Sequence, residues 1–404
     1  MNRKYGFPRH IGFPGSILIV LSLLPVPLFA QAPILLSYER NFIRANLADK
    51  AAILRDAATD EQAGEFIGVL YEFALDFTLR HADLFREDSE MLTLTGLAVR
   101  GAGLAGHHAS ADTLWRIFQS YPNSLIRVDV LGALGNLGAG NPQAITYINQ
   151  FLSDTNSRFH SGIAPDYPVL SAAINALARG GNRTSFPVLF AAINAGYPNQ
   201  ISREATLALN AIPYNYAPFL MEVIRKNPPA EKLAAFSLGA YNEKFTLTEQ
   251  GELAEAALET GFNIPADTPE NDALLSSLRY ASIPVLARLK WTRATSLVIK
   301  HFYQIQTGYT QGRIPKDRFL EAIHCLGAMG NSEAAQVLTL QLGFLNSQTE
   351  RTGEFDETLI LALVNALREI GDKIAFDYLL YIGYLSYSEP IKAAAREALT
   401  RLKW

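Results

Sequence analysis

The feature that most constrains the fold is a short motif that recurs along most of the chain: a small residue, Leu, two or three mixed residues and then Gly. Its clearest copies read ALGNLG (residues 133–138), ALARGG (176–181), CLGAMG (325–330) and ALREIG (366–371). With weaker copies included, the motif leucine returns every 29 to 48 residues, at Leu97, Leu134, Leu177, Leu209, Leu238, Leu286, Leu326, Leu367 and Leu399. A mean period of about 38 residues is that of one antiparallel helix pair in a stacked repeat protein. The sequence therefore predicts an all-α fold, an α-solenoid of about eight or nine helix pairs over residues 89–404.

Two positions of the motif have a physical explanation. The small residue before the leucine lets neighbouring helices approach closely, and the glycine falls where a helix ends and φ becomes positive. Cys325 occupies the small-residue position that Ala133, Ala176 and Ala366 fill in other copies. We therefore expect Cys325, the one cysteine of the chain, to be a small core residue and not a redox-active or crosslinking thiol.

A G-x-G-x-x-G sequence at Gly101, Gly103 and Gly106 offers a competing interpretation, the phosphate-binding turn of a dinucleotide enzyme. Aligned on the repeat, however, Gly101 corresponds to Gly138, and the tripeptide GAG occurs at both places. The segment after the glycines begins the next motif helix, and no alternation of strands and helices follows. We therefore interpret these glycines as an inter-helix turn, and we expect no nucleotide and no other cofactor.

The C-terminal copy, SEPIKAAAREALTRL (residues 388–402), resembles a HEAT repeat of the short bacterial kind that is also seen in phycobilin-lyase-type repeat proteins. In that family a Pro precedes a Val-Arg pair, an alanine run and then Ala-Leu-Gly. The matching positions here are Pro390, Ile391, Lys392, residues 393–395, Ala398 and Leu399, and another copy supplies Ile126, Arg127, Ala133, Leu134 and Gly135. The resemblance covers about residues 90–404 and implies an armadillo-like stack of HEAT-like helix pairs. It implies little about function.

The N-terminal residues predict export. Arg3, Lys4 and Arg9 precede an apolar core at residues 16–24, and two prolines follow before the sequence LFAQAP. This pattern is typical of a secretory signal peptide, here residues 1–30 with cleavage after Ala30. We expect an exported protein, periplasmic if the source is a diderm bacterium, with no stable membrane insertion after cleavage.

Residues 31–88 are predicted to form an N-terminal helical capping region that covers the open end of the solenoid core. Thr59 and Gln62 form a possible capping box before an apolar helix at residues 65–85.

Charge and motif content narrow the classes of partner and chemistry. The net charge of −4 becomes −7 without the three bases of residues 1–30, and no basic run is present, so we expect no nucleic-acid partner. His107, His108 and Asp112 are the one compact group that resembles metal ligands. Adjacent histidines on a turn rarely face one ion, so we expect solvated turn residues and no metal site. The sequence contains no nucleophile motif that would indicate an enzyme.

Four polar segments, at residues 153–168, 261–272, 307–316 and 346–355, predict long loops. Each follows the second helix of a pair, so all four are expected on one edge of the solenoid, where repeat proteins often bind partners. The side chains that we expect at this partner-binding edge are Arg158, Tyr167, Tyr309, Arg313 and Arg351.

Tyrosines recur every three residues from Tyr378, at Tyr381, Tyr384 and Tyr387. On a helix these steps walk around half the surface, so core packing with hydroxyl groups at the rim explains them. The alternative is that Tyr381, Tyr384 and Tyr387 form an aromatic contact surface.

The leading functional hypothesis is an exported, non-catalytic scaffold or adaptor that binds another cell-envelope protein through one face or loop edge of the solenoid. The alternative is a polysaccharide lyase or hydrolase with an α/α toroid fold, because such enzymes are also exported and built from helix hairpins. An open solenoid would favour the scaffold, and a closed or tightly wound ring would favour the enzyme.

Overall fold

The computed structural model describes residues 33–64 and 66–403, so the predicted signal peptide at residues 1–30 lies outside the described residues. The described chain is helical almost throughout, with one isolated parallel bridge between Asp372 and Lys403 and no named strand. The helices are α1 (Pro33–Arg44), α2 (Leu47–Thr59), α3 (Ile67–Arg80), α4 (Ala82–Phe85), α5 (Ser89–Leu104), α6 (Ala111–Ser120), α7 (Ser124–Leu137), α8 (Pro142–His160), α9 (Tyr167–Gly180), α10 (Phe186–Asn194), α11 (Asn199–Ala211), α12 (Ala217–Lys226), α13 (Pro229–Gly239), α14 (Leu247–Asn263), α15 (Pro269–Leu289), α16 (Thr295–Thr310), α17 (Lys316–Met329), α18 (Ser332–Thr352), α19 (Glu357–Ile370), α20 (Phe376–Tyr381) and α21 (Glu389–Thr400). Short 3₁₀ turns are η1 (His108–Ser110), η2 (Arg183–Ser185), η3 (Thr292–Ala294), η4 (Lys373–Ala375) and η5 (Ile382–Tyr384). The all-α prediction is confirmed for this part of the chain.

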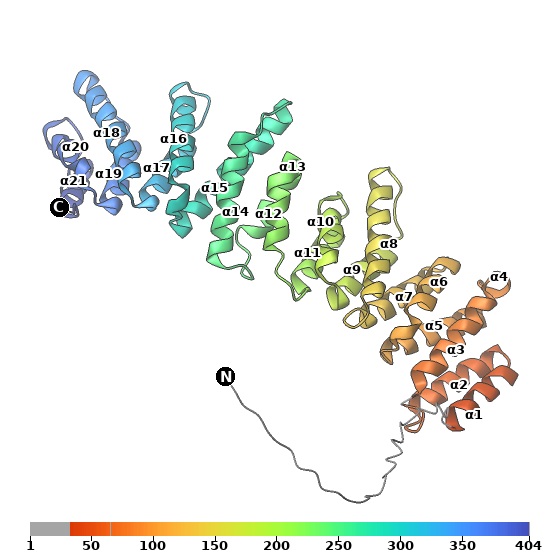
Figure 1. Ribbon diagram of the computed structural model, residues 1–404. Helices are drawn as coiled ribbons and strands as arrows, with labels where there is room; N and C mark the ends of the chain where they lie inside the picture. The colour runs from red at the N-terminus through yellow and green to blue at the C-terminus, as the bar shows by residue number, and fades with distance from the viewer. Residues whose placement is uncertain (1–32, 65, 404) are drawn as a thin grey trace, which may run out of the picture.

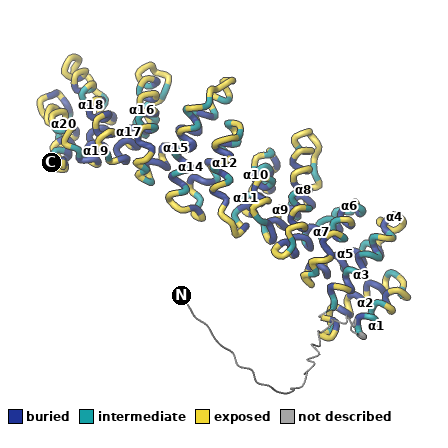
Figure 2. The backbone as a smooth tube through the Cα atoms, in the orientation of Figure 1, coloured by how far each residue is buried: buried dark blue, intermediate teal, exposed yellow. Residues whose placement is uncertain are grey.

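The helices follow one another along an open, curved row, with α1 at one end and α21 at the other (Figure 1). Each odd-numbered helix from α5 to α9 packs against the next odd-numbered helix, and the same holds from α13 to α21. From α6 onward, each even-numbered helix also packs against the odd-numbered helix that follows it. Buried segments run along the whole row, and exposed residues gather at the turns (Figure 2). The core is therefore a continuous strip between neighbouring helices.

Small residues set the closest approaches between the odd-numbered helices. A Cβ atom added to Gly135 on α7 would lie 2.8 Å from the Cβ atom of Ala176 on α9. A Cβ atom added to Gly327 on α17 would lie equally close, at 2.8 Å, to the Cβ atom of Ala366 on α19. Cys325 is fully buried two residues before Gly327, and its thiol lies 3.6 Å from a main-chain oxygen of α15. The small-residue position of the motif is thus a helix-contact position, as the sequence predicted.

The G-x-G-x-x-G glycines lie at a helix contact and a helix end. Gly101 and Gly103 belong to α5, while Gly106 has φ +63° in the turn that follows. A Cβ atom on Gly101 would overlap the ring of Tyr71, and one on Gly103 would lie 2.7 Å from the Cβ atom of Ala133 on α7. Gly101 and Gly103 permit close packing of helices, and only Gly106 lies in the turn, so the interpretation as an inter-helix turn holds for Gly106 alone.

The prediction of a capping box at Thr59 and Gln62 is wrong. Thr59 is the last residue of α2, and its hydroxyl group donates to the carbonyl oxygen of Asp56 at 2.9 Å. The main-chain N–H of Gln62 donates to the side chain of Asp60, which follows α2, and α3 begins only at Ile67. Thr59 and Gln62 instead belong to the end of α2 and the turn after it, because a threonine hydroxyl group there can bond to a nearby main-chain carbonyl group.

The regular packing is interrupted at two neighbouring pairs. Helix α11 packs less closely against α13, and α10 against α12, than the odd–odd and even–even pairs on either side of them do. In α11 the motif reads Ala-Leu-Asn, so Asn210 stands where α7 has a glycine. The side-chain oxygen of Asn210 accepts hydrogen bonds from the hydroxyl of Tyr216 at 2.7 Å and from the amide of Asn242 at 3.3 Å. On the even-numbered side the rings of Phe190 and Phe219 meet edge to face, with centroids 5.7 Å apart. At this joint, hydrogen bonds and ring contacts between side chains link helices that do not pack closely.

A buried asparagine–tyrosine link occurs twice with the same sequence separation of 41 residues. The hydroxyl of Tyr197 donates to Asn156 Oδ1 at 3.1 Å, and the hydroxyl of Tyr387 donates to Asn346 Oδ1 at 3.0 Å. Each asparagine also donates its side-chain N–H to a main-chain carbonyl of the next even-numbered helix, at 3.1 Å in both cases. Each link joins an even-numbered helix to the next even-numbered helix and to the segment that follows it, at equivalent places of the two repeats, which is what a repeated unit requires.

Candidate functional site

The segments that the sequence predicted as long loops are largely helical. Helices α8, α14, α16 and α18 continue into them, and only short turns remain at residues 161–166, 264–268, 311–315 and 353–356. The polar composition misled the prediction because serine and threonine can bond to the carbonyl group four residues earlier within a helix. Thr155 does this to Phe151 at 2.7 Å, and Thr352 does it to Gln348 at 3.0 Å.

The five residues predicted at the partner-binding edge do not form one site. Tyr309 and Arg351 line the same cleft, which has a volume of about 620 Å³. Arg158 lines a second, smaller cleft of about 190 Å³ near the end of α8. Tyr167, in the first turn of α9, and Arg313, in the turn after α16, line neither of these clefts.

The larger cleft, which we call the α16–α19 cleft, lies between the ends of α16 and α18 and the beginning of α17 and α19. Its apolar lining consists of Phe319, Phe344, Leu345, Phe355, Leu359 and Ile360. Its volume is within the range of about 300–1,000 Å³ that proteins use for small ligands. Tyr309 closes one side, with its ring tilted against Phe319 at a centroid distance of 5.2 Å.

Polar side chains interrupt the apolar lining. Gln341 is 6% exposed and Thr349 is 3% exposed, although both line the cleft. The side-chain N–H of Gln306 on α16 donates to the side-chain oxygen of Gln341 on α18. The hydroxyl of Thr349 donates to the main-chain oxygen of Glu354 at 3.3 Å. Sequence reasoning missed these residues; the available signal was a glutamine at a core position within the apolar run VLTLQLGFL.

Charged groups lie at the rim of the α16–α19 cleft. Lys316 and Asp356 form an ion pair at 3.0 Å. Burial raises the pKa of the Asp356 carboxyl, but the hydrogen bonds from Lys316 and from two main-chain N–H groups outweigh it and leave the pKa below its usual value. Arg351 is exposed, and its Nε–H donates to the carbonyl oxygen of Ser347 at 3.2 Å. The cleft therefore combines an apolar interior with a rim on which positive and negative charges balance.

The tyrosine stripe does not form one surface. Tyr387 is 4% exposed and belongs to the core through its bond to Asn346, so it is not available for a surface contact. Tyr384 is 78% exposed on η5, and Tyr381 donates its hydroxyl proton to Glu350 at 2.6 Å. The stripe divides because α20 ends at Tyr381, which turns the later tyrosines into new directions.

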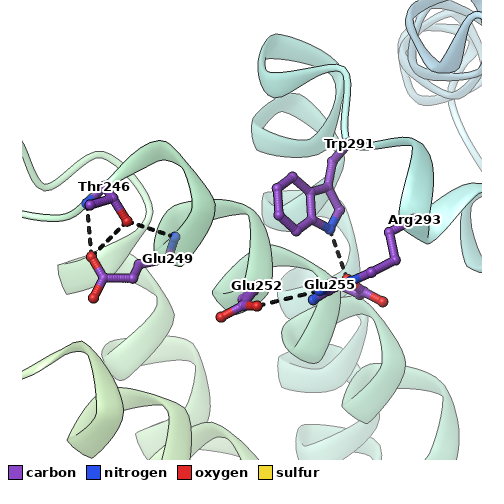
Figure 3. A network of polar contacts seen from close by, with 6 residues as sticks. All are labelled: Thr246, Glu249, Glu252, Glu255, Trp291 and Arg293. Carbon is purple, nitrogen blue, oxygen red and sulfur yellow. Dashed lines mark hydrogen bonds and ion pairs between the residues drawn. The ribbon is translucent and has the colours of Figure 1, made fainter.

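A second groove, of about 380 Å³, lies between α12 and α14 and carries several carboxylates. Figure 3 shows that these acids have structural partners: Glu249 accepts from the N-cap residue Thr246, and Arg293 reaches Glu252 at 3.3 Å and Glu255 at 2.6 Å. The indole N–H of Trp291 also donates to Glu255, at 2.7 Å. Glu252 and Glu255 therefore hold α14 to the turn before α16, while Glu249 caps its own helix.

The histidines at the end of α5 point to different neighbours. His107 Nδ1 lies 2.9 Å from the hydroxyl of Ser110 and 3.6 Å from a carboxylate oxygen of Glu72, and this side chain is partly buried. The ring of His108 lies beside Gly140, one helix pair further on. Within residues 33–64 and 66–403, no group of three or more histidine, cysteine or acidic side chains could hold a metal ion.

Two further titratable groups are deeply buried. Burial raises the pKa of the Cys325 thiol to about 12. His301 on α16 is 2% exposed, and burial, followed by the charges of Arg279 and Arg318, lowers its pKa to about 4. Its Nδ1 has no hydrogen-bond partner among the described residues. Both groups are therefore neutral near pH 7.

Comparison with models of known protein families finds no match to this sequence, and comparison with curated proteins finds no relative. In the described part of the chain, none of the helices is both long and apolar enough to cross a bilayer.

Proposed function

We propose that this protein is an exported α-solenoid of HEAT-like helix pairs that binds another cell-envelope protein through the edge where α16 and α18 end. The observation that carries this proposal is the α16–α19 cleft. It brings together Tyr309 and Arg351, two residues that the sequence placed at a partner-binding edge, around an apolar interior. Exposed apolar surface with a polar rim is the usual anatomy of a protein-binding site.

The repeat architecture is supported by the serial packing of the odd-numbered helices, the Gly–Ala contacts at equivalent places and the twice-repeated asparagine–tyrosine link. The open row, with its first and last helices at opposite ends (Figure 1), supports a solenoid over a closed α/α toroid. Small-angle scattering tests this shape. A compact globule of this length has a radius of gyration of about 21 Å, and we expect a clearly larger value.

Export is proposed from the basic residues, apolar core and Ala30 of the N-terminal sequence. N-terminal sequencing of the protein recovered from its own host tests this directly. A chain that begins at Gln31 supports signal-peptide cleavage, and an intact N-terminus contradicts it.

Partner binding is tested by in vivo photo-crosslinking from single positions. Phe344, 57% exposed in the α16–α19 cleft, carries the crosslinker in one variant, and Leu207, 69% exposed on α11, carries it in the control. We expect one discrete crosslinked protein from position 344 and none from position 207. Equal crosslinking from both positions would argue against a partner at this edge. Turnover of a polysaccharide that disappears on Arg351→Ala would favour an enzyme instead.

A further inference from the structure

The α16–α19 cleft contains two side-chain amide groups, those of Gln306 and Gln341, whose hydrogen-bonding groups are only partly satisfied. A glutamine side chain offers one carbonyl acceptor and two N–H donors. The bond from Gln306 to Gln341 uses one N–H of the first and the carbonyl oxygen of the second. Among the described residues, no other group bonds to the remaining Gln306 carbonyl oxygen or to the Gln341 amide N–H groups. An acceptor and a donor therefore remain side by side on neighbouring helices.

The position of Gln341 makes this pair significant. The residue is 6% exposed and lines the cleft, so a ligand in the cleft can meet its amide group. Gln341 Nε2 is not one of the fully buried, unpartnered atoms of the described residues, so a ligand acceptor takes the place of water there and gains about 0.5–1.5 kcal/mol. The arrangement thus favours a ligand that presents an acceptor and a donor together.

We propose that the α16–α19 cleft binds an extended peptide segment of the partner protein, with one peptide residue bonded to the Gln306–Gln341 pair and an apolar side chain between the exposed Phe344 and Phe355. This inference rests on the proposed function and specifies its partner. A residue in extended conformation directs its N–H and C=O groups to the same side, as in a β-ladder, and so matches one acceptor and one donor.

The lining also selects against a charged ligand. Lys316 and Asp356 neutralise each other, and Arg351 and Glu354 add one charge of each sign. Phe344 and Phe355 are exposed to 57% and 36%, so an apolar side chain between them removes phenyl surface from water. What favours a peptide over an oligosaccharide is the adjacent acceptor and donor of the amide pair, which match the N–H and C=O groups of one extended residue.

The test uses the chain from residue 31 to 404 and a phage-displayed library of random hexapeptides as the probe. We expect enrichment of sequences that share one aliphatic or aromatic residue. Binding of the selected hexapeptide should weaken about 10-fold for Gln341→Met and for Phe344→Ala. Gln336→Met, an exposed glutamine on the same helix outside the cleft, should bind as the wild type does. Methylation of the main-chain nitrogen of the shared residue should weaken binding by a similar factor.

Phe344→Ala changes an exposed side chain, so it keeps the test informative if Gln341→Met fails to fold. Undiminished binding to Phe344→Ala, or no loss on main-chain methylation, would overturn the peptide proposal. Binding to an oligosaccharide array but to no hexapeptide would overturn it as well. A discrete crosslink from position 344 combined with no selected hexapeptide would leave the partner-binding function standing and remove only peptide recognition.

Discussion

Substitution of Gly135 by alanine should destabilise the protein, although the same change stabilises most helices. In an open helical position, Gly→Ala adds about 0.5–1 kcal/mol to the free energy of unfolding because it reduces the freedom of the unfolded chain. At position 135 the new Cβ atom would lie 2.8 Å from both Cα and Cβ of Ala176 and 3.1 Å from its carbonyl oxygen. Ordinary contacts between carbon atoms are about 3.5–4.0 Å, so α7 and α9 would have to move apart.

Overpacking of this kind costs about 1–3 kcal/mol, which exceeds the gain from helix propensity. The expected result is a net loss of up to about 2 kcal/mol for Gly135→Ala. Gly132→Ala is the matched control, because it lies in the same helix and its nearest neighbour is the end of Arg179 at 3.9 Å. It should stabilise by about 0.5–1 kcal/mol.

Urea denaturation followed by both circular dichroism and fluorescence measures these differences, provided that the two signals coincide. Ala176→Gly in the Gly135→Ala background should recover part of the loss, because it removes the opposing methyl group. If Gly135→Ala stabilised the protein as much as Gly132→Ala does, the close contact between α7 and α9 would be refuted.

Three further predictions follow from buried groups. Asn346→Ala removes one hydrogen bond from the buried Tyr387 hydroxyl and one from a main-chain carbonyl, so the free energy of unfolding in urea should fall by about 2–3 kcal/mol. The exposed Asn136→Ala should change it by less than about 0.5 kcal/mol. Since burial raises the pKa of Cys325 to about 12, its thiol should react with a disulfide reagent at pH 8 only after unfolding; rapid reaction of the native protein would contradict this. Because the pKa of His301 falls from 6.5 to about 4 on folding, the unfolded chain binds the proton more readily, and the free energy of unfolding should decrease by up to about 3 kcal/mol as the pH falls from 6.5 to 4. His301→Leu should flatten this dependence, and an unchanged profile would argue against a buried neutral imidazole.

The helical class, the contact position at Ala133, Ala176 and Ala366 and the burial of Cys325 were predictable because each depends on local spacing. A period of one helix pair and a small residue beside a glycine constrain helix packing wherever they occur. The length of α8 and α18 was not predictable in the same way. Their polar ends bond back to their own helix carbonyls or are buried, as Thr155 and Asn346 are, and these bonds depend on the neighbouring helices.

By itself the sequence determined the helical class, the small residues at helix contacts and which chemistry-bearing motifs are missing, because these follow from residue type and periodicity. Only the tertiary structure decided that Tyr309 and Arg351 share a cleft while Arg158, Tyr167 and Arg313 do not, and that Tyr387 is a core residue. It also decided that Gln306 and Gln341, 35 residues apart, meet as an amide pair. Such meetings depend on the spacing between whole helices, which side chains far apart in the sequence set together.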